Sequence, residues 1–328
     1  MKIPPTYIEN SKIVRLLIQI EELVQTYKDQ KYNPITLKYH RRKSILKSSL
    51  YSARIEGNNL DDRILTNFHS VPQSNAKIEL SNLVGAIESV QKRDWSKNLE
   101  LSDLKDLHHL AMRGLLGGAG ELRQEPSAIY NMAGIAVYLC PAPSDLSKLL
   151  SDLLSFINKE QTYSPLVQVA ISHYVFEKIH PFQDGNGRVG RVLIHLLIKK
   201  YGYDLLGLLS FEEYIDKNRQ DYYDLLGQEK NNIVDFVEFV LESFVYGLRQ
   251  GLVDLSVPRD TSPRTLLMPR RQELLALITD HPFASFNFIH RRFMAVPGRT
   301  IRYDLKYLSD HEYIIKLGST KGVLYSPK

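Results

Sequence analysis

Apolar side chains recur at spacings of three and four residues through most of the first 250 positions of the chain. This period places them on one face of an α-helix, so each run predicts a helix with one buried side. Glycine and proline residues separate several of the runs, as expected for turns. This part of the chain is therefore predicted to be mainly helical. The predicted helices span residues 13–27, 37–55, 78–92, 101–116, 146–158, 166–179, 188–201 and 233–248.

One segment, residues 128–139, departs from the helical pattern. Its apolar and aromatic side chains fall into two short groups, Ile129 with Tyr130 and Val137 with Tyr138, and an Asn and a Gly lie between them. Short runs of β-branched and aromatic residues around such a turn are typical of two paired strands. The segment is therefore predicted to form a β-hairpin.

A different pattern begins after residues 251–263, which we interpret as a linker because prolines, serines and threonines gather in and just beyond it. Three shorter helical runs follow, and after them two strand-like runs separated by a glycine-bounded turn. This order is typical of a winged helix-turn-helix domain. The predicted helices are 271–280, 285–293 and 300–309, and the predicted strands are 313–317 and 323–326.

The composition is that of a globular protein, with 43% hydrophobic and 24% charged residues among 328. Cys140 is the only cysteine in the sequence, so an internal disulfide is excluded. No apolar run reaches the roughly 18 residues of a membrane span, and the first residues lack the pattern of a signal peptide. We therefore expect a cytoplasmic protein without a membrane partner.

The net charge of +5 is unevenly distributed. Residues 264–328 contain 11 Lys or Arg but 5 Asp or Glu, so the rest of the chain is close to neutral. Arg299, Arg302 and Lys306 fall on one face of the last predicted helix. Such a face could contact the phosphates of DNA, although winged helices also dock proteins. Both interpretations stay open.

The strongest indication of chemistry is segment 180–191, whose sequence is His-Pro-Phe-Gln-Asp-Gly-Asn-Gly-Arg-Val-Gly-Arg. It lies between two predicted helices. Gly185, Asn186 and Gly187 allow backbone conformations that direct consecutive N–H groups into one concavity at the start of the second helix. Backbone N–H groups in this arrangement bind anions, so the segment predicts an anion site.

Side chains of the same segment supply the other groups that polyphosphate chemistry requires. Arg188 and Arg191 are three residues apart on the predicted helix, so both guanidinium groups project from one face. Asp184 could hold Mg²⁺, because this metal is bound through few carboxylates together with phosphate oxygens. His180, with an ordinary pKa of about 6.5, can accept a proton from a hydroxyl group at neutral pH.

This segment resembles the Fic motif, H-P-F-x-[D/E]-G-N-G-R-x-x-R, and matches every specified position. The resemblance implies a helical core with a small hairpin flap. It also implies a protein adenylyltransferase, which transfers AMP from ATP to a Ser, Thr or Tyr hydroxyl of a target protein. By matching positions, His180 would be the general base and Asp184 the Mg²⁺ ligand. The ATP phosphates would be held by Gly185, Asn186, Gly187, Arg188 and Arg191.

The resemblance extends to residues outside the motif. The hairpin residues Ile129, Tyr130, Val137 and Tyr138 would form a flap that aligns the target protein by strand addition. Tyr222 and Tyr223 would either line the adenine pocket or belong to the core.

A second match, Ser-Ala-Arg-Ile-Glu-Gly at residues 52–57, resembles the inhibitory pattern [S/T]-x-x-x-E-[G/N] of the same family. It places Ser52, Glu56 and Gly57 at a predicted helix end. A carboxylate there could pair with an arginine of a neighbouring helix. The resemblance implies that Glu56 pairs with Arg191 and keeps this arginine from the γ-phosphate.

These observations predict four regions: an N-terminal helical region with the inhibitory helix (1–75), a Fic catalytic domain (76–250), the linker (251–263) and a winged helix-turn-helix domain (264–328). The main alternative is a DNA-binding transcriptional regulator in which the Fic domain senses a nucleotide. A homodimer is left open. The spacing of His173, Glu177 and His180 could be mistaken for a metal site, but the motif claims His180 as the base.

Overall fold

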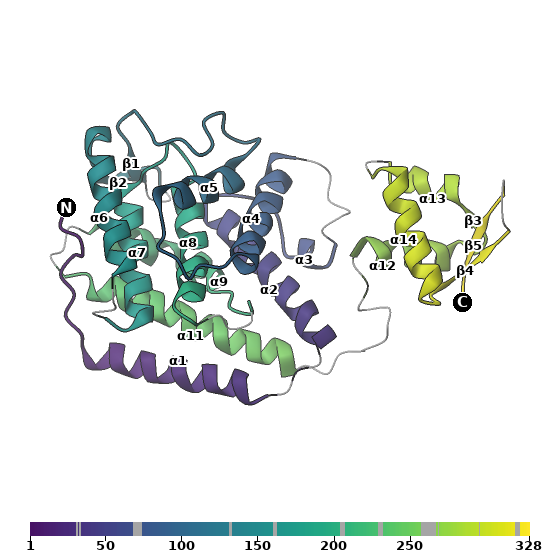
Figure 1. Ribbon diagram of the computed structural model, residues 1–328, viewed down its shortest axis with the longest axis horizontal. Helices are drawn as coiled ribbons and strands as arrows, with labels where there is room; N and C mark the ends of the chain where they lie inside the picture. Colours follow the sequence, from purple (N-terminus) through teal and green to yellow (C-terminus); the bar gives the residue numbers. More distant parts are fainter. Residues whose placement is uncertain are drawn as a thin grey trace. The chain divides into compact units, whose positions relative to one another are not determined.

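The computed structural model describes residues 1–30, 32, 34–67, 74–130, 133–159, 163–203, 207–228, 232–256, 267, 269–294, 296–318 and 322–328. Contacts divide the chain into two units (Figure 1). The first contains Met1–Asp61 and Gln73–Val257, and the second contains Asp62–Pro72 and Pro258–Lys328. Each unit has its own cluster of buried apolar side chains.

The first unit is built from helices and one small hairpin. Its elements are α1 (Ser11–Asp29), α2 (Pro34–Ile55), α4 (Asn75–Lys92), α5 (Leu101–Met112), β1 (Ala128–Tyr130), β2 (Ala136–Leu139), the 3-10 helix η1 (Pro143–Asp145), α6 (Leu146–Asn158), α7 (Pro165–Ile179), α8 (Asn186–Lys200), α9 (Glu212–Lys217), α10 (Arg219–Gly227) and α11 (Val234–Ser256).

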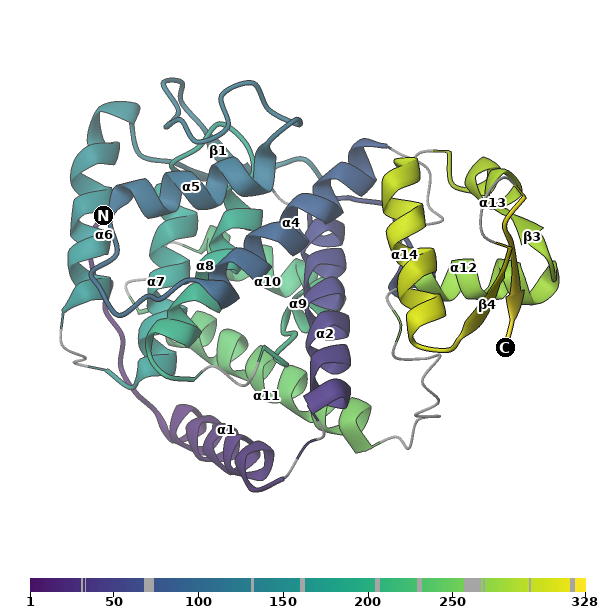
Figure 2. The ribbon, with the colours of Figure 1, turned by 45° about the vertical axis from the view of Figure 1, so that its right-hand side comes forward.

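Helix α8 is the centre of this unit. It packs against α2, α4, α5 and α7, and Figure 2 shows it enclosed among the last three. Every residue from Arg188 to Ile198 is buried. A helix enclosed on all sides has no solvent-facing polar stripe, so each polar side chain on it needs a partner inside the protein. The polar residues of α8 are therefore fixed by the elements that surround them.

Helix α1 lies along α11 at the edge of the unit (Figure 1). Its apolar face is buried through Ile13, Ile20 and Tyr27, and the Tyr27 hydroxyl donates to the carbonyl oxygen of Leu248 at 2.8 Å. The Asn10 side chain begins the helix by accepting hydrogen bonds from two backbone N–H groups of its first turn. The apolar face of α1 is therefore buried against α11.

The predicted hairpin is confirmed. β1 and β2 pair antiparallel, with Ile129 opposite Tyr138 and an irregularity in register after Ile129. The sheet has two strands within the described residues, so each strand has an outer edge whose backbone groups are not paired with a third strand.

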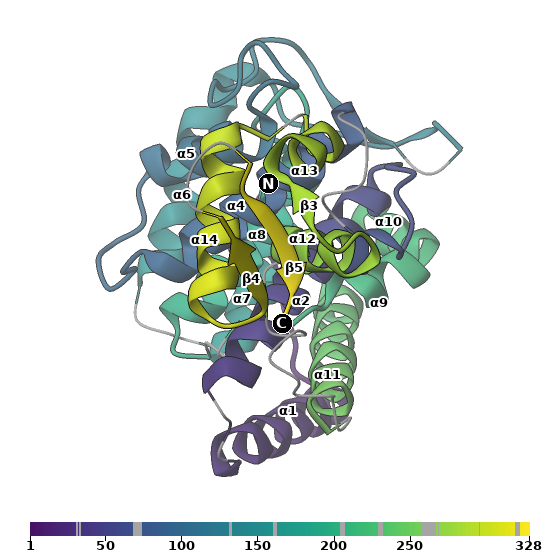
Figure 3. The same ribbon diagram turned by 90° about the vertical axis from the view of Figure 1, so that its right-hand side faces the viewer.

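The second unit combines short helices with a three-stranded antiparallel sheet. Figure 3 shows β5 between β3 and β4. On α14 the side chain of Asp304 is fully buried and accepts hydrogen bonds from Nε of Arg270 at 2.5 Å and Nε of Arg271 at 2.9 Å. These two ion pairs join α12 to α14. The elements are α3 (Ile64–Asn67), α12 (Pro269–Asp280), β3 (Ala284–Ser285), α13 (Phe286–Arg292), α14 (Gly298–Asp310), β4 (Ile314–Leu317) and β5 (Leu324–Pro327).

The mainly helical class with a small hairpin is confirmed, but some boundaries differ. The predicted helix 101–116 ends at Met112, because Gly114 takes a positive φ of 75° soon afterwards. Helix α11 continues to Ser256, so the first six residues of the predicted linker 251–263 are helical, and Leu252 and Leu255 pack against the core. The other linker residues lie outside the described part of the chain.

The helices α3, α9 and α10 were not predicted, since each is too short for a clear apolar period. The segment that contains α3 groups with the second unit rather than with the N-terminal region in which we placed it. The helices α12, α13 and α14 and the strands β4 and β5 follow the predicted order, whereas the two-residue strand β3 between α12 and α13 was not predicted. The winged helix-turn-helix domain stays a prediction. No helix in the described part of the chain combines the length and the apolar character needed to cross a membrane.

Candidate active site

The loop between α7 and α8 carries the Fic-like motif and is bounded by two left-handed residues. His180 follows α7 with φ 50° and ψ 60°, and Gly185 precedes α8 with φ 82°. Glycine is needed at position 185, because its φ favours glycine and because a Cβ there would lie 2.6 Å from Sδ of Met112. The loop is therefore a tight turn that joins two buried helices.

Two side chains brace this loop from inside. Asn186 accepts from the backbone N–H of Phe182 at 2.9 Å and donates from Nδ2 to the Phe182 carbonyl at 2.8 Å. Nδ1 of His108 accepts from the N–H of Gly120 at 2.7 Å, so its Nε2 carries the proton and donates to the Asp184 carbonyl at 2.9 Å. The His108 ring also stacks on Phe182 with centroids 3.8 Å apart.

These contacts change the interpretation of one predicted residue and add another. Asn186 was expected at the phosphates, but both polar atoms of its side chain hold the loop, so its backbone N–H is the group left for an anion. His108 was not predicted as a site residue. Its position became visible only in the fold, because it lies 76 residues from the carbonyl that it binds.

The imidazole of His180 is oriented by the end of its own helix. Its Nδ1 lies 3.2 Å from the carbonyl oxygen of Glu177, so Nδ1 carries the proton and Nε2 is the basic nitrogen. Burial lowers the pKa of His180, although the hydrogen bond to Glu177 and the carboxylates of Glu56 and Asp184 act in the opposite direction. The ring is therefore neutral at pH 7 and able to accept a proton.

The first turn of α8 offers backbone N–H groups without a capping side chain, because its N-cap is Gly185. The carboxylate of Glu56 lies directly over this turn. A Cβ built on Gly187 would fall 2.3 Å from Oε1 of Glu56 and 3.1 Å from Nη1 of Arg191. The position where the sequence predicted an anion is therefore next to a carboxylate of the chain itself.

Arg191 is paired with the end of α2. Its side chain is 1% exposed, and its Nη2 donates to Oε1 of Glu56 at 2.7 Å. Nε donates to Oγ of Ser52 at 2.8 Å, and Nη2 also donates to the Ser52 carbonyl at 2.9 Å. Burial alone would lower the pKa of Arg191, but the carboxylate of Glu56 raises it overall. Arg191 is thus a buried cation held by one carboxylate and one serine.

The dipole of helix α2 does not stabilise the negative charge of Glu56. It directly follows Ile55, the last residue of α2, and a negative charge at a helix C-terminus is disfavoured by the helix dipole. Gly57, with φ 94°, turns the chain away behind it. The ion pair with Arg191 is therefore the interaction that accounts for a carboxylate at this position.

Arg188 and Arg191, which the spacing on the helix predicted to face one ligand, are held by different carboxylates. Arg188 donates to Oε1 of Glu79 and to Oδ1 of Asp184, both at 2.6 Å. Burial would lower the pKa of Arg188, but the surrounding carboxylates of Glu56, Asp184 and Glu79 raise it. Glu79, on α4, was not predicted because 109 residues separate it from Arg188.

Asp184 is the residue expected to hold a metal. Its side chain is 60% exposed, while Oδ1 accepts from Arg188 and from the N–H of Gly185. The described residues contain no group of three or more His, Cys, Asp or Glu side chains placed to bind a metal together. An exposed carboxylate next to backbone N–H groups fits a Mg²⁺ that takes its remaining ligands from phosphates and water.

A cavity of about 170 Å³ lies between α8, α7, α10 and the hairpin. His180, Arg191 and Glu56 line it together with Gly187 of the α8 turn. Its other walls come from the hairpin, α7 and α10: Ala128, Ile129, Tyr130, Glu177, Tyr222, Tyr223 and Leu226. The structure therefore brings the predicted base, one predicted arginine, the glutamate predicted to be inhibitory and both tyrosines into one cavity.

Tyr222 belongs to a buried polar cluster next to the cavity. Tyr222 is buried, and its hydroxyl lies 3.0 Å from Nε2 of His173. Its neighbour Glu177 is buried beneath α8, where a Cβ on Gly190 would lie 2.0 Å from Oε1 of Glu177. Burial raises the pKa of Glu177 to about 8 and lowers that of His173 to about 3, so both groups are largely neutral at pH 7. This polar cluster was not predicted.

The predicted flap residues divide between the cavity and the outside. Ile129 is buried, whereas Tyr130 is 57% exposed, and both line the cavity. Val137 and Tyr138 lie on the second strand, β2. A Cβ on Gly227 of α10 would lie 3.0 Å from Cβ of Val137, and Nζ of Lys178 on α7 lies 3.5 Å from the ring centroid of Tyr138. The hairpin thus contacts α7 and α10 through β2 and faces the cavity through β1.

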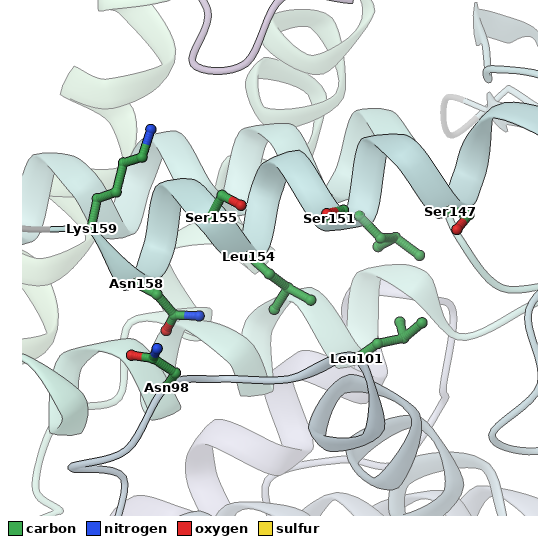
Figure 4. Close-up of a pocket in the computed structure, with 9 residues that line it drawn as sticks. Asn98, Leu101, Ser147, Ser151, Leu154, Ser155, Asn158 and Lys159 are labelled. Carbon is green, nitrogen blue, oxygen red and sulfur yellow. The ribbon is translucent and has the colours of Figure 1, made fainter.

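A larger hollow of about 570 Å³ lies along α6 and contains none of the predicted site residues. Figure 4 shows Ser147, Ser151 and Ser155 spaced along the helix, with Leu101 and Asn98 facing it from another segment. Of its lining residues in the described part of the chain, Lys159 alone is charged, and none is a histidine or an arginine, so the smaller cavity is the candidate active site.

Comparison with known proteins agrees with this geometry. Residues 98–198 match the Fic/DOC family. Protein adenylyltransferase Fic of Aedes aegypti is 28% identical over 227 residues, which cover 63% of this chain and 42% of that protein. The chain thus spans about two fifths of the length of this relative.

Solved structures share the fold. A Fic family protein from Desulfovibrio desulfuricans G20 superposes with a TM-score of 0.67 at 25% identity, covering 99% of this chain and 98% of that one. Fic-1 from C. elegans superposes with a TM-score of 0.60 at 20% identity, covering 74% and 72%. The chain therefore shares the fold of Fic family proteins, and its residues 98–198, which include the loop of residues 180–191, match the Fic/DOC family.

Proposed function

We propose that this protein is an adenylyltransferase that transfers AMP from ATP to a Ser, Thr or Tyr hydroxyl group of a target protein. The observation that carries the proposal is the common cavity of His180, Arg191 and the first turn of α8. A neutral imidazole, a buried guanidinium and uncapped N–H groups are the parts that phosphorus-centre transfer needs. The name of the Aedes aegypti relative supports the same activity.

In the proposed reaction Nε2 of His180 takes the proton of the acceptor hydroxyl. The hydroxyl oxygen forms a bond to the α-phosphorus of ATP, and the bond from that phosphorus to the β-phosphate bridging oxygen breaks, so pyrophosphate leaves. The N–H groups at the start of α8 would face the phosphates, and Arg191 would neutralise charge on them. Most of the contribution of the chain is therefore positioning and electrostatic stabilisation.

We assign the metal-binding role to Asp184. Mg²⁺ bound by this carboxylate and the phosphates would neutralise part of the charge that develops on the leaving pyrophosphate. Asp184 would keep one oxygen for Arg188, which holds the carboxylate at the edge of the loop.

The Glu56–Arg191 pair is proposed as a brake on this reaction. Glu56 lies over Gly187, next to the N–H groups expected to bind phosphate, and it occupies Nη2 of Arg191. The cavity of about 170 Å³ is also smaller than the roughly 300–1,000 Å³ of typical ligand sites. Productive binding of ATP would therefore require Glu56 to withdraw.

The hairpin is proposed to align the target protein. Within the described residues its sheet consists of two strands, and β1 lines the cavity that contains His180. An extended segment of the target could pair with an edge of this sheet and place its hydroxyl group near Nε2. The exposed Tyr130 would contact this segment.

Intact-mass spectrometry of the protein incubated with Mg²⁺ and ATP tests the proposed reaction. We expect self-modified species heavier by one AMP moiety, and label should be retained from ATP labelled at the α-phosphate but not from ATP labelled at the γ-phosphate. Incorporation of γ-label alone would instead identify a phosphoryl transfer and overturn the proposal.

The lowered pKa of His180 predicts the pH dependence of transfer. A histidine with a lowered pKa loses its proton at a lower pH, so the base form persists on the acid side of its ordinary value of about 6.5. We expect the acid limb of kcat/KM for ATP in self-modification to be centred below pH 6.5, with little change between pH 8 and 7. The measurement uses buffers of constant ionic strength, and an acid limb centred above pH 7 would contradict the assignment.

A second candidate function concerns the second unit. Arg299, Arg302 and Lys306 are exposed on α14, while Ile301 and Leu305 of the same helix are buried. This arrangement supports a winged helix-turn-helix that contacts DNA phosphates, with the Fic domain acting as a nucleotide sensor. Gel-shift assays with duplex DNA at increasing salt test it. Absence of binding at low salt would favour a protein-docking role.

A further inference from the structure

Arg123 occupies an unusual position between α5 and β1. The residue is 3% exposed, and its guanidinium donates to carbonyl oxygens of several segments. Nε donates to the backbone carbonyl of His180 at 2.7 Å, Nη1 to that of Glu125 at 2.9 Å, and Nη2 to that of Pro141 at 2.5 Å. Nη2 also lies 3.4 Å from the Ile179 carbonyl, and the backbone N–H of Arg123 donates to the Pro181 carbonyl at 3.0 Å.

These acceptors belong to two structures that the sequence keeps apart. Glu125 precedes β1 and Pro141 follows β2, so they mark the two ends of the hairpin. Ile179 and His180 form the junction of α7 with the loop that leads to α8. One guanidinium group therefore joins both ends of the hairpin to the backbone of the proposed base.

The position is costly for a cation. Burial lowers the pKa of Arg123, and its hydrogen bonds within the described chain go to neutral carbonyl groups. Burying a charge without a carboxylate partner costs free energy that the hydrogen bonds offset only in part. Its planar fork of five N–H donors matches several acceptors that a lysine or glutamine could not reach together.

We infer that Arg123 is a positioning residue that fixes the distance between the hairpin and His180 and thereby aligns the acceptor hydroxyl with the base. The inference rests on the proposed function, since it concerns transfer to a hydroxyl presented along the hairpin. The contacts of β2 with α7 and α10 hold the middle of the hairpin, but they do not connect its ends to the loop that leads to α8. Arg123 supplies that connection.

The test compares Arg123→Lys and Arg123→Gln with the control Lys200→Gln in the full chain. Lys200 also donates to carbonyl oxygens, those of Trp95 and Lys97, but it lies at the far end of α8. Hydrogen–deuterium exchange is measured by mass spectrometry for each variant. We expect amides of residues 126–141 to exchange at least tenfold faster in both Arg123 variants, with α8 amides and the Lys200→Gln control unchanged.

Kinetics in the Glu56→Gly background complete the test, because the brake is absent there. We expect Arg123→Lys to lower the self-modification rate at least tenfold, with the dissociation constant of ATP, measured by calorimetry, changed less than threefold. Equal loss of ATP affinity, or faster exchange throughout the Fic domain, would show a merely structural role and overturn the inference. If Glu56→Gly itself transfers no AMP, the proposed function fails, and unchanged exchange at 126–141 would separately refute the role of Arg123.

Discussion

His180→Ala is expected to lower the rate of AMP transfer by about 100- to 10,000-fold, which is the range for loss of a general base. Nε2 of His180 is the one group assigned to the proton of the acceptor hydroxyl. The N–H groups of α8 and the guanidinium of Arg191 do not depend on the imidazole. ATP should therefore bind with nearly the affinity of the parent protein, so the loss should appear in kcat.

The measurement is made in the Glu56→Gly background, where we expect faster transfer, with α-labelled ATP for the rate and calorimetry for binding. His109→Ala is the matched control, since this histidine neighbours His108 but lies outside the cavity. A rate within threefold of the parent for His180→Ala would show that another group takes the proton.

The local part of the site could be predicted from sequence, because it is contained in one continuous segment. Left-handed residues at 180 and 185 form a tight turn before α8, and this turn brings together the proposed base and the N–H groups proposed to bind phosphate. The hairpin could be predicted for the same reason, since its strands are close in sequence. Local backbone preferences therefore determine these features.

The partners of the buried polar side chains could not be predicted in this way. Arg188 is held by Glu79, and the loop is braced by His108, although neither residue belongs to a recognisable motif. Their roles arise because α4 and α5 pack on α8, where every polar group must find a partner in the interior. A general rule identifies the need for such partners, but the fold decides which residues they are.

The position of Arg123 could not be predicted from the sequence either. In the sequence it is one arginine in an irregular segment between Glu121 and Glu125, and no periodic pattern or motif singles it out. Its acceptors are backbone carbonyl groups, which every residue possesses, so no residue type in the sequence marks them. Only the convergence of Glu125, Pro141 and His180 in space reveals its position.

Glu56→Gly should accelerate AMP transfer at least tenfold. The change removes the carboxylate that occupies Nη2 of Arg191 and covers the first turn of α8. Breaking a fully buried ion pair from one side costs about 3–5 kcal/mol, because the remaining charge is left without its partner. The Glu56 side chain is 27% exposed, so a smaller loss is expected here. We therefore expect the nucleotide-free variant to melt at a lower temperature, and the phosphates of ATP to restore stability by pairing with Arg191.

The double variant distinguishes a brake from a general loosening of the helix end. Adding Arg191→Ala should cancel the gain, because the freed guanidinium is what the phosphates require. Glu56→Gln keeps the size of the side chain but removes its charge, so it should also be activated, though less than Glu56→Gly. Asp29→Gly removes a carboxylate at the end of α1 and serves as the control for added flexibility. Equal rates of label transfer from α-labelled ATP in Glu56→Gly and the parent protein would show that the Glu56–Arg191 pair stabilises the fold without restraining the reaction.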